Sequence, residues 1–377
     1  MTIKVPYVDL AAQWYHERNE LLPIIEEILE SGQYVGSDQV SAFEKEVAEY
    51  LNVGYVCALN SGTDALVCGL HALGIRPGDE VITPPNSFVA STAAIVHLGA
   101  IPVFVDVLPD QNIDPKKVLA AVTKKTKVIM PVHLTGRVAN MPAIIDIAQT
   151  EGLLVLEDAA QAIGSEINGV KAGSWGAVGC FSTHPLKNLN AIGDGGFLAT
   201  NDQEIYEKVS RMRNHGLVNR EVVDQFGYVS RLDSIQAGIL RYRLSKLESV
   251  IEQRKKNADV YREHLDPESV IVPPINPGEK NTWHTFVIQV QKRNALRDHL
   301  RGVGIETAIH YPVPIHLQPA AEFLGYRKGS FPEAEKQAEE ILTLPIHQYL
   351  NMSDIVLIAR EVNEFLRKCY ENRDRSR

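Results

Sequence analysis

The chain has 377 residues, of which 45% are hydrophobic and 23% charged, and its formal net charge at pH 7 is -9. This length is enough for two domains with sizeable cores, and the composition is that of an ordinary soluble protein. The negative charge argues against a nucleic acid as the main partner. Residues 1–9 lack the apolar core of a signal peptide, and no apolar run is long enough to cross a membrane. The four cysteines are scattered, without metal-ligand spacing. We therefore expect a cytoplasmic protein with no metal and no membrane partner.

The first part of the chain alternates short apolar runs with longer stretches of helical periodicity. The apolar runs predict buried strands at residues 55–59, 80–83, 101–105, 128–132 and 153–157. The stretches between them predict helices at residues 64–73, 91–98, 115–122 and 141–151. This order is typical of an α/β fold whose mostly parallel sheet lies between helices. In such sheets ligands bind beyond the carboxyl ends of the strands, so residues there are the first candidates for a functional site.

The second half of the chain changes in pattern. Further strands and helices are predicted at residues 178–182, 196–200, 233–264, 286–290, 294–302 and 354–370. The helix at 233–264 is long, and the segment after it has its own apolar strand and helices. We place a domain boundary inside this helix. The prediction is a large domain at residues 1–248 and a smaller C-terminal α/β domain at residues 249–377.

Two residues near the ends of the predicted strands suggest a specific chemistry. Asp158 follows the apolar run at 153–157, and Lys187 stands about thirty residues later in a polar turn before a cluster of glycines. Pyridoxal phosphate (PLP) chemistry needs such a pair. The lysine amine condenses with the cofactor's aldehyde, and the carboxylate keeps the pyridine nitrogen protonated. Taken alone, the two residues also fit a solvated surface lysine and an aspartate that caps a helix.

Other side chains would complete a cage around this cofactor. Gly62 and Thr63 begin a helix after a strand, where backbone N–H groups and the helix dipole favour a phosphate, and Ser182 offers a second hydroxyl. Phe88 follows a strand and a turn, so its ring can stack on a pyridine. Gln161, about one helical turn beyond the aspartate, can donate to a phenolate oxygen. The same residues are compatible with a capped helix start, a core phenylalanine and a solvated glutamine.

Seven motifs in order along the chain resemble those of the DegT/DnrJ/EryC1/StrS family of sugar aminotransferases, which belong to the aspartate-aminotransferase superfamily. The motifs are NSGTDAL at 60–66, PxxSFVAS at 84–91, EDAAQ at 157–161, PLKNL at 185–189, GDGG at 193–196, SRLD at 230–233 and HYP at 310–312. The resemblance spans residues 5–362, nearly the whole chain. It implies the PLP-dependent transferase fold of the aspartate-aminotransferase type.

The resemblance also implies a role for each cofactor-binding residue. Lys187 would carry the cofactor as a Schiff base and move a proton between the substrate carbon and the cofactor. Asp158 would pair with the pyridine nitrogen and Gln161 with the phenolate oxygen. The residues that would hold the phosphate or stack on the ring are Gly62, Thr63, Ser182 and Phe88.

Members of the family are homodimers whose active sites are completed across the interface. Arg231 of the SRLD motif would reach into the partner's site and bind the carboxylate of the amino donor, for which a guanidinium is well shaped. A structural salt bridge is the alternative for this residue. The chain has Val229 where the family commonly has an asparagine that contacts the phosphate from the second subunit, so that contact is in question. His184 stands where the family often has an aromatic residue. The two roles open to His184 are a substrate contact and a side chain that fills this space.

The function implied by the resemblance is a PLP-dependent aminotransferase that carries the amino group of glutamate to a nucleotide-linked keto sugar by a ping-pong mechanism. The candidate sugar contacts, in two loops that also fit ordinary loop structure, are His310, Tyr311, His316 and Tyr34. A carbonyl of a free sugar acid or a cyclitol is an alternative acceptor.

Three other functions are weighed against this one. Sugar dehydratases of the same family carry a histidine in place of Lys187, so the lysine argues against that reaction. A non-catalytic regulatory protein that keeps the fold remains an alternative, which turnover with glutamate would exclude. An NAD enzyme is disfavoured, because the glycine cluster at 193–196 lacks the spacing and the strand–helix setting of a dinucleotide loop.

Overall fold

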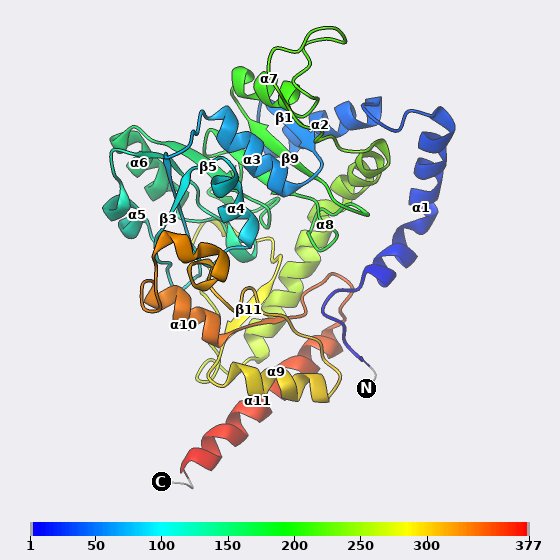
Figure 1. Cartoon of the computed structure of the whole chain (residues 1–377). Coiled ribbons are helices and arrows are strands. Elements are labelled where there is room, and N and C mark those ends of the chain that lie inside the picture. Colours follow the sequence, from blue (N-terminus) through cyan, green and yellow to red (C-terminus); the bar gives the residue numbers. More distant parts are fainter. Residues whose placement is uncertain (1–2, 375–377) are drawn as a thin grey trace.

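The computed structural model describes residues 3–374, and its largest element is a twisted seven-stranded sheet (Figure 1). In spatial order the strands are β1 (Tyr55–Leu59), β9 (Gly196–Thr200), β8 (Val178–Ser182), β5 (Leu154–Asp158), β4 (Thr126–Ile129), β2 (Glu80–Thr83) and β3 (Ile101–Phe104). Only β9 runs against its neighbours in this sheet; the other strands are parallel to one another. The predicted mostly parallel sheet is therefore confirmed.

Helices cover both faces of this sheet. Successive side chains of a strand point to opposite faces, and here both sets are apolar and need to be buried. Along β1, Val56 and Ala58 face one apolar cluster, whereas Cys57 and Leu59 face another. The first cluster includes side chains of α2 (Asp38–Leu51), α5 (Pro115–Ala121), α6 (Met141–Glu151) and α8 (Ser234–His264). The second includes side chains of α3 (Gly62–Ala72), α4 (Val89–His97) and α7 (Gln203–Met212). Strands buried on both faces explain why their sequences read as continuous apolar runs.

A second, smaller core lies at the other end of α8. Here β11 (Phe286–Gln289) pairs antiparallel with β12 (Ile341–Leu344) and packs with α9 (Arg293–Gly302) and α11 (Met352–Asp374). The remaining elements are α1 (Leu10–Ser31), α10 (Pro332–Glu340), β6 (Glu166–Ile167), β7 (Val170–Lys171), β10 (Glu279–Lys280) and three short 3-10 turns, Leu134–Gly136, Ile315–Leu317 and Pro319–Leu324. Within α8 the change from one core to the other falls between Ile251 and Ala258, and Val5 joins the smaller core. The domain boundary between residues 248 and 249 stays a prediction.

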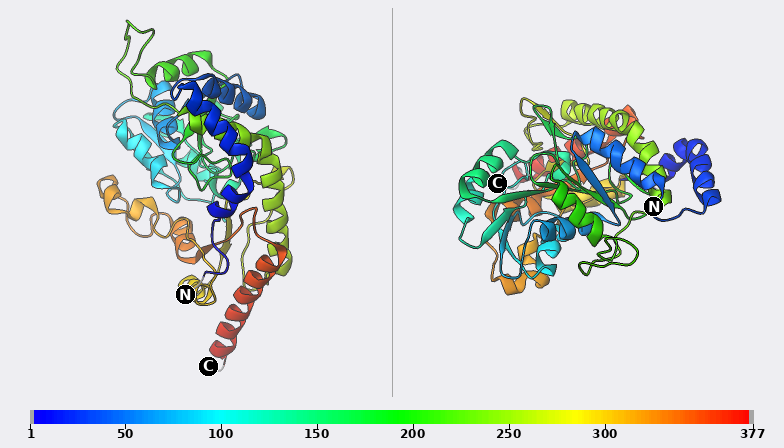
Figure 2. Two further views of the ribbon diagram at one scale, coloured as in Figure 1. Left: turned by 90° about the vertical axis from the view of Figure 1, so that its right-hand side faces the viewer. Right: turned by 90° about the horizontal axis from the view of Figure 1, so that it is seen from above.

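Three segments shape the surface. Helix α1 stands along one side of the molecule, apart from the central sheet, and α11 extends toward the C-terminus (Figures 1 and 2). The segment after α7, residues 213–230, projects from the opposite end (Figure 2). Among the helices of residues 3–374, none has the length and hydropathy needed to cross a membrane.

Candidate active site

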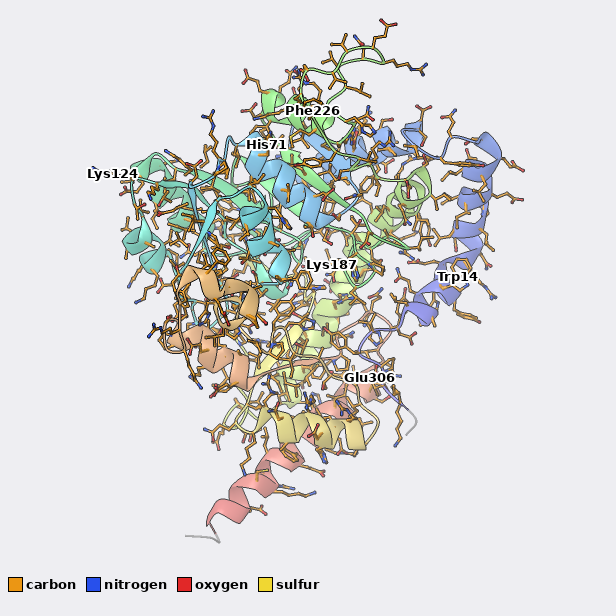
Figure 3. All side chains as sticks on the ribbon, viewed as in Figure 1. Trp14, His71, Lys124, Lys187, Phe226 and Glu306 are labelled. Carbon is orange, nitrogen blue, oxygen red and sulfur yellow. The ribbon has the colours of Figure 1, made fainter. Side chains whose placement is uncertain are left out.

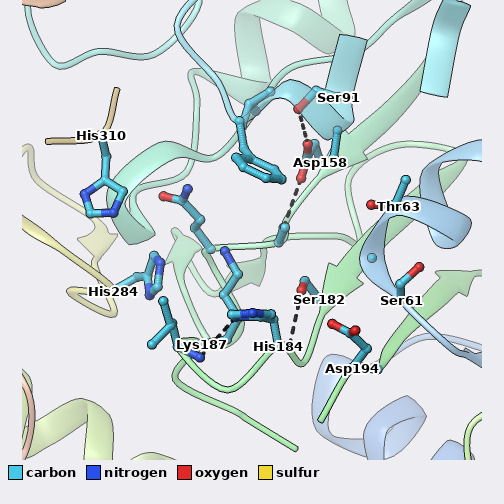
Figure 4. Close-up of a pocket in the computed structure, with 18 of the residues that line it drawn as sticks. Ser61, Thr63, Ser91, Asp158, Ser182, His184, Lys187, Asp194, His284 and His310 are labelled. Carbon is cyan, nitrogen blue, oxygen red and sulfur yellow. Dashed lines mark hydrogen bonds between the residues drawn. The ribbon is translucent and has the colours of Figure 1, made fainter. Parts of the chain in front are cut away.

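A cavity of about 450 Å³ lies between the two cores, at the carboxyl ends of the parallel strands. It is lined by the N-terminal segment, by the beginnings of α3 and α4, by the end of β5, by the turn after β8 and by residues of the smaller domain. The sequence-predicted residues in its lining are Gly62, Thr63, Phe88, Asp158, Gln161, Ser182, Lys187, His310 and Tyr311. Figure 4 shows Thr63 and Ser182 on one side of this cavity and His284 and His310 on the other.

Asp158, the last residue of β5, is held in the cavity by two hydrogen bonds. Its side chain is only 4% exposed. One carboxyl oxygen accepts from the hydroxyl of Ser91 at 2.6 Å, and the other accepts from the backbone N–H of Ala160 at 3.2 Å (Figure 4). Burial raises the pKa of Asp158, and these hydrogen bonds together with the nearby amine of Lys187 oppose the rise. A carboxylate in this position favours a cation or a protonated ring nitrogen as its partner.

Lys187 reaches the same cavity from the turn between β8 and β9. Its backbone N–H donates to the carbonyl of His184 at 2.8 Å, which fixes the turn. Enclosure by protein lowers the pKa of the Lys187 amine to about 8, although Asp158 acts in the opposite direction. A substantial part of the amine is thus uncharged near neutral pH, the form that reacts with a carbonyl.

The Lys187 turn is tied to three distant parts of the chain. The amide of Asn188 donates to the carbonyl of Thr282 at 2.8 Å. Asn190 and Gln13 of α1 exchange two side-chain hydrogen bonds of 3.0 Å each, and Arg243 of α8 donates to the carbonyl of Asn190 at 2.7 Å. These buried contacts hold the lysine in one place relative to the sheet.

The opposite side of the cavity suits a phosphate. The hydroxyl of Ser61 caps α3 by accepting from the backbone N–H of Asp64 at 3.1 Å, and the first turn of this helix lines the cavity. A Cβ atom on Gly62 would lie 2.7 Å from the Cβ of Ser182, so only glycine lets α3 approach β8 this closely. The hydroxyls of Thr63 and Ser182 and the positive end of the helix dipole then face the same space.

An exposed aromatic ring and an amide complete the cavity. Phe88 is 55% exposed although it lines the cavity, and its ring lies 5.8 Å from that of Tyr311, centroid to centroid. Gln161 accepts from the backbone N–H of Thr135 at 2.8 Å, and its amide nitrogen lies 3.5 Å from the Tyr311 hydroxyl. His310 contacts the hydroxyl of Thr343 at 3.0 Å. An apolar ring open to a polar cavity is available to stack on a ligand.

Three predicted residues do not lie in this cavity. His316 is only 2% exposed and bonds to Glu335 at 3.0 Å, with its ring against Phe331, so the structure does not bring it to the site. Tyr34 is 52% exposed and its hydroxyl donates to a backbone carbonyl of α1 at 3.3 Å. Arg231 is also outside the lining and donates to the side chain of Asn214 at 3.2 Å, so its described partner is an amide and not a carboxylate. His184 does line the cavity.

Several lining residues carry no signal in the sequence. Tyr7, Arg254, His284 and His347 come from the N-terminal segment, from α8 and from the smaller domain, and none lies in a recognisable motif. Ser91 is in a motif, but its bond to Asp158 became visible only in the fold.

These groups match the separate parts of PLP. The amine of Lys187 suits its aldehyde, the carboxylate of Asp158 suits its ring nitrogen, and the start of α3 with Ser182 suits its phosphate. The exposed face of Phe88 suits its ring. Within residues 3–374 no group of three or more metal-ligating side chains is gathered. The cavity therefore fits an organic, phosphorylated cofactor.

Comparisons with known proteins agree with this geometry. The sequence model of the DegT/DnrJ/EryC1/StrS aminotransferase family matches residues 16–363. The chain is 42% identical to a UDP-N-acetyl-3-dehydro-alpha-D-glucosamine 3-aminotransferase of Acidithiobacillus ferrooxidans, over 96% of this chain and 98% of the relative. It is 41% identical to a "pleiotropic regulatory protein" of Geobacillus stearothermophilus, over 97% and 99%. The crystal structure of S. venezuelae DesV in complex with a ketimine intermediate superposes with a TM-score of 0.94 at 38% identity, covering 97% of this chain and 99% of that one. The predicted fold is confirmed, and the chain is an enzyme that belongs to the DegT/DnrJ/EryC1/StrS aminotransferase family.

Proposed function

We propose that this enzyme is a PLP-dependent aminotransferase that moves the amino group of glutamate to the carbonyl of a nucleotide-linked keto sugar, in two half-reactions at one site. The observation that carries the proposal is the placement of Lys187 and Asp158 in one cavity, with a phosphate-binding helix start beside them. The name of the Acidithiobacillus relative, a 3-aminotransferase of a UDP-linked sugar, supports the acceptor class.

Each residue has a distinct task in this reaction. PLP supplies, when bound, an aldehyde that takes up the amino group and a ring that withdraws electrons from the reacting carbon. Asp158, fixed by Ser91, would hold the proton on the ring nitrogen. Lys187 Nζ, whose pKa is lowered to about 8, can take a proton from the donor's α-carbon and return it in the second half-reaction. Gly62 and Thr63 would hold the phosphate, and Phe88 would stack on the ring.

The activity test separates the two half-reactions. Purified enzyme loaded with PLP is mixed with glutamate, and 2-oxoglutarate is measured; one equivalent per site is expected without any acceptor. A panel of UDP- and dTDP-linked 3-keto and 4-keto sugars, a free keto sugar acid and a keto cyclitol is then added, and products are identified by mass spectrometry. Amination of only the free acid or the cyclitol would replace the nucleotide-sugar acceptor with one of these. Loss of water without gain of nitrogen would indicate a dehydratase.

Lys187→Ala is the variant that tests the assignment. It removes both the covalent attachment and the proton carrier, so we expect transamination to fall by several orders of magnitude while PLP still binds reversibly. Lys171→Ala, in β7 and outside the cavity, is the matched control and should keep wild-type rates. Retention of substantial turnover by Lys187→Ala would reject the mechanism.

A regulatory role is the second candidate, since a relative 41% identical over nearly the whole chain is named for regulation. A protein that only regulates needs the fold and has no need of a reactive amine with a lowered pKa facing a fixed carboxylate. The same glutamate assay decides between the two: a chain that binds PLP but releases no 2-oxoglutarate would be regulatory.

We also propose that the enzyme works as a homodimer with shared active sites. Arg231 lies outside its own cavity, in the stretch that follows the projecting segment 213–230. That segment exposes Phe226 fully and Val229 by half, and α1 exposes Trp14 by 43% (Figure 3). Large apolar side chains exposed on the surface favour contact with another chain, and a second copy is the partner that would place Arg231 near a glutamate carboxylate.

A further inference from the structure

Arg254 brings a guanidinium into the active-site cavity without a counter-ion. It lies on α8, is 7% exposed, and lines the same cavity as Lys187. Its Nη1 donates to two backbone carbonyls, those of Trp283 at 3.1 Å and His284 at 3.2 Å. Its Nε is buried and has no hydrogen-bond partner in the part of the chain that the structure describes. No ion pair with a carboxylate within residues 3–374 neutralises it.

The other three buried arginines are satisfied differently. Arg137, 4% exposed, lies 3.4 Å from Glu279 and 3.8 Å from Asp110. Arg243 lies on the same helix as Arg254 and is 8% exposed. Its Nη2 lies 2.7 Å from the carboxylate oxygen Oε2 of Glu17. Arg293, 6% exposed, uses Nε, Nη1 and Nη2 to bond three oxygen atoms. A buried charge without such compensation is destabilising, and an anionic ligand in the cavity would compensate a guanidinium that lines it. The contrast within one helix makes Arg254 the exception.

The histidines around Arg254 leave its guanidinium, with the amine of Lys187, to supply the positive charge at this end of the cavity. Burial lowers the pKa of Arg254 to about 10, so the group is still protonated at neutral pH. Burial also lowers the pKa of His284 and of His347, so both imidazoles are neutral there. Their Nδ1 atoms are buried and without partners among the described residues. A positive guanidinium beside neutral polar groups is suited to an anion.

We propose that Arg254 binds one carboxylate of the amino donor within its own subunit. The inference rests on the proposed function and deepens it. Glutamate carries two carboxylates. In the proposed homodimer Arg231 of the partner subunit accounts for one of them, and Arg254 accounts for the other. Two separated cations would select a dicarboxylate over an amino acid with a neutral side chain.

The test measures binding without turnover. Glutarate, which has both carboxylates but neither an amino nor a keto group, is titrated calorimetrically into the PLP-loaded enzyme. Arg254→Gln should weaken glutarate binding at least ~30-fold, the range measured when one partner of a buried charge pair is removed. Arg262→Gln is the control on the same helix, since Arg262 is half-buried, bonds the carbonyl of Pro273 and does not line the cavity; it should stay within about twofold of wild type.

Kinetics and the cofactor spectrum separate failure of this proposal from failure of the proposed function. In Arg254→Gln the concentration of glutamate that half-saturates the first half-reaction should rise, while the PLP spectrum stays as in wild type. Unchanged glutarate affinity with an unchanged spectrum would overturn the proposal. Absence of any glutamate reaction in wild type would instead overturn the function.

If Arg254→Gln does not fold, Arg254→Lys carries the test: a point charge without the planar fork should cost roughly tenfold in glutarate affinity, and no loss would again overturn the proposal.

Discussion

At the scale of single residues, the candidate chemistry depends on where charge is stable. Enclosure lowers the pKa of the Lys187 amine, and burial raises the pKa of the Asp158 carboxyl, so each group is moved toward its neutral form. Each also stabilises the charged form of the other. The hydroxyl of Ser91 donates a hydrogen bond of 2.6 Å to the Asp158 carboxylate and so favours its ionised form. The site thus places a hydrogen-bonded carboxyl group beside an amine that can lose its proton near neutral pH.

The first prediction concerns the titration of Lys187. The rate at which the cofactor-free enzyme captures PLP should rise with pH and level off above a midpoint near 8, because only the uncharged amine attacks the aldehyde. At pH 7.5 roughly a quarter of an amine with a pKa of about 8 is uncharged, against about 0.1% of an ordinary lysine. Stopped-flow absorbance between pH 6 and 10 measures this.

A variant checks the cause of the titration. Asp158 raises the pKa of the lysine, so Asp158→Asn should move the midpoint to lower pH. A capture rate that shows no levelling up to pH 10 in the wild-type enzyme would show that the amine is not perturbed. The same midpoint in both proteins would show that the two groups do not interact.

Residues in local motifs could be predicted from the sequence, and residues brought in by the fold could not. Lys187, Asp158 and Gly62 stand beside strand ends or helix starts, where short patterns reveal them. Arg254 lies in the middle of a helix whose periodicity does not distinguish it from a surface arginine. His316 was placed with the sugar contacts because it is near the HYP motif, but the turn after Pro314 directs its ring into a small cluster with Phe331.

At the scale of elements, one carboxylate joins the strand that carries Asp158 to the segment that precedes β8. Glu157 is fully buried and accepts four hydrogen bonds of 2.8 Å, from His133 Nε2 and from the backbone N–H groups of Gly173, Trp175 and Gly176. His133 Nδ1 accepts from the backbone N–H of Ala139, so its Nε2 carries the proton. The backbone of His133 also donates to the carbonyl of Asp158 at 3.0 Å.

The second prediction is that Glu157→Gln destabilises the fold and weakens PLP binding. The amide places an NH2 group against backbone donors, so at least two of the four hydrogen bonds are lost, and we expect a loss of about 3 kcal/mol in the free energy of unfolding. Urea denaturation of the cofactor-free protein measures the first effect, and PLP titration the second. Glu151→Gln, an exposed change at the end of α6, is the control. A change below about 1 kcal/mol would show that Glu157 does not hold these elements together.

Which elements could be predicted follows from how they are buried. The central strands are covered on both faces, so their apolar runs end close to the observed boundaries, and α6 matches its predicted range of residues 141–151. Helices α1, α2, α7 and α10 and strand β12 have no counterpart among the predicted elements. Of α1, only Gln13, Leu21 and Ile28 are buried, so little apolar periodicity marks it in the sequence. Strands β6, β7 and β10 have two residues each, too few for any pattern.

At the scale of the whole molecule, the surface suggests that a single chain is incomplete. The projecting segment 213–230 and helix α1 both expose large apolar side chains, among them Phe226 and Trp14 (Figure 3). Arg231 follows this segment and has an amide, not a carboxylate, as its partner. A cation without a carboxylate partner, next along the chain to a segment with exposed apolar side chains, fits a side chain that completes a site in a second copy.

The last prediction tests this arrangement by mixing subunits. Lys187→Ala chains and Arg231→Ala chains should each be inactive as homodimers. If Arg231 works in the partner's site, one site of every mixed dimer keeps both residues and the other keeps neither. Random exchange of equal amounts then restores roughly a quarter of wild-type activity per total protein, because half of the dimers are mixed and half of their sites are intact. If Arg231 works in its own subunit, every site lacks one residue and no activity returns. Mixed dimers are verified by affinity tags on one chain only. Inactive mixtures in which such dimers are present would place Arg231 in its own subunit's site or outside catalysis, and would leave the apolar surface to another role.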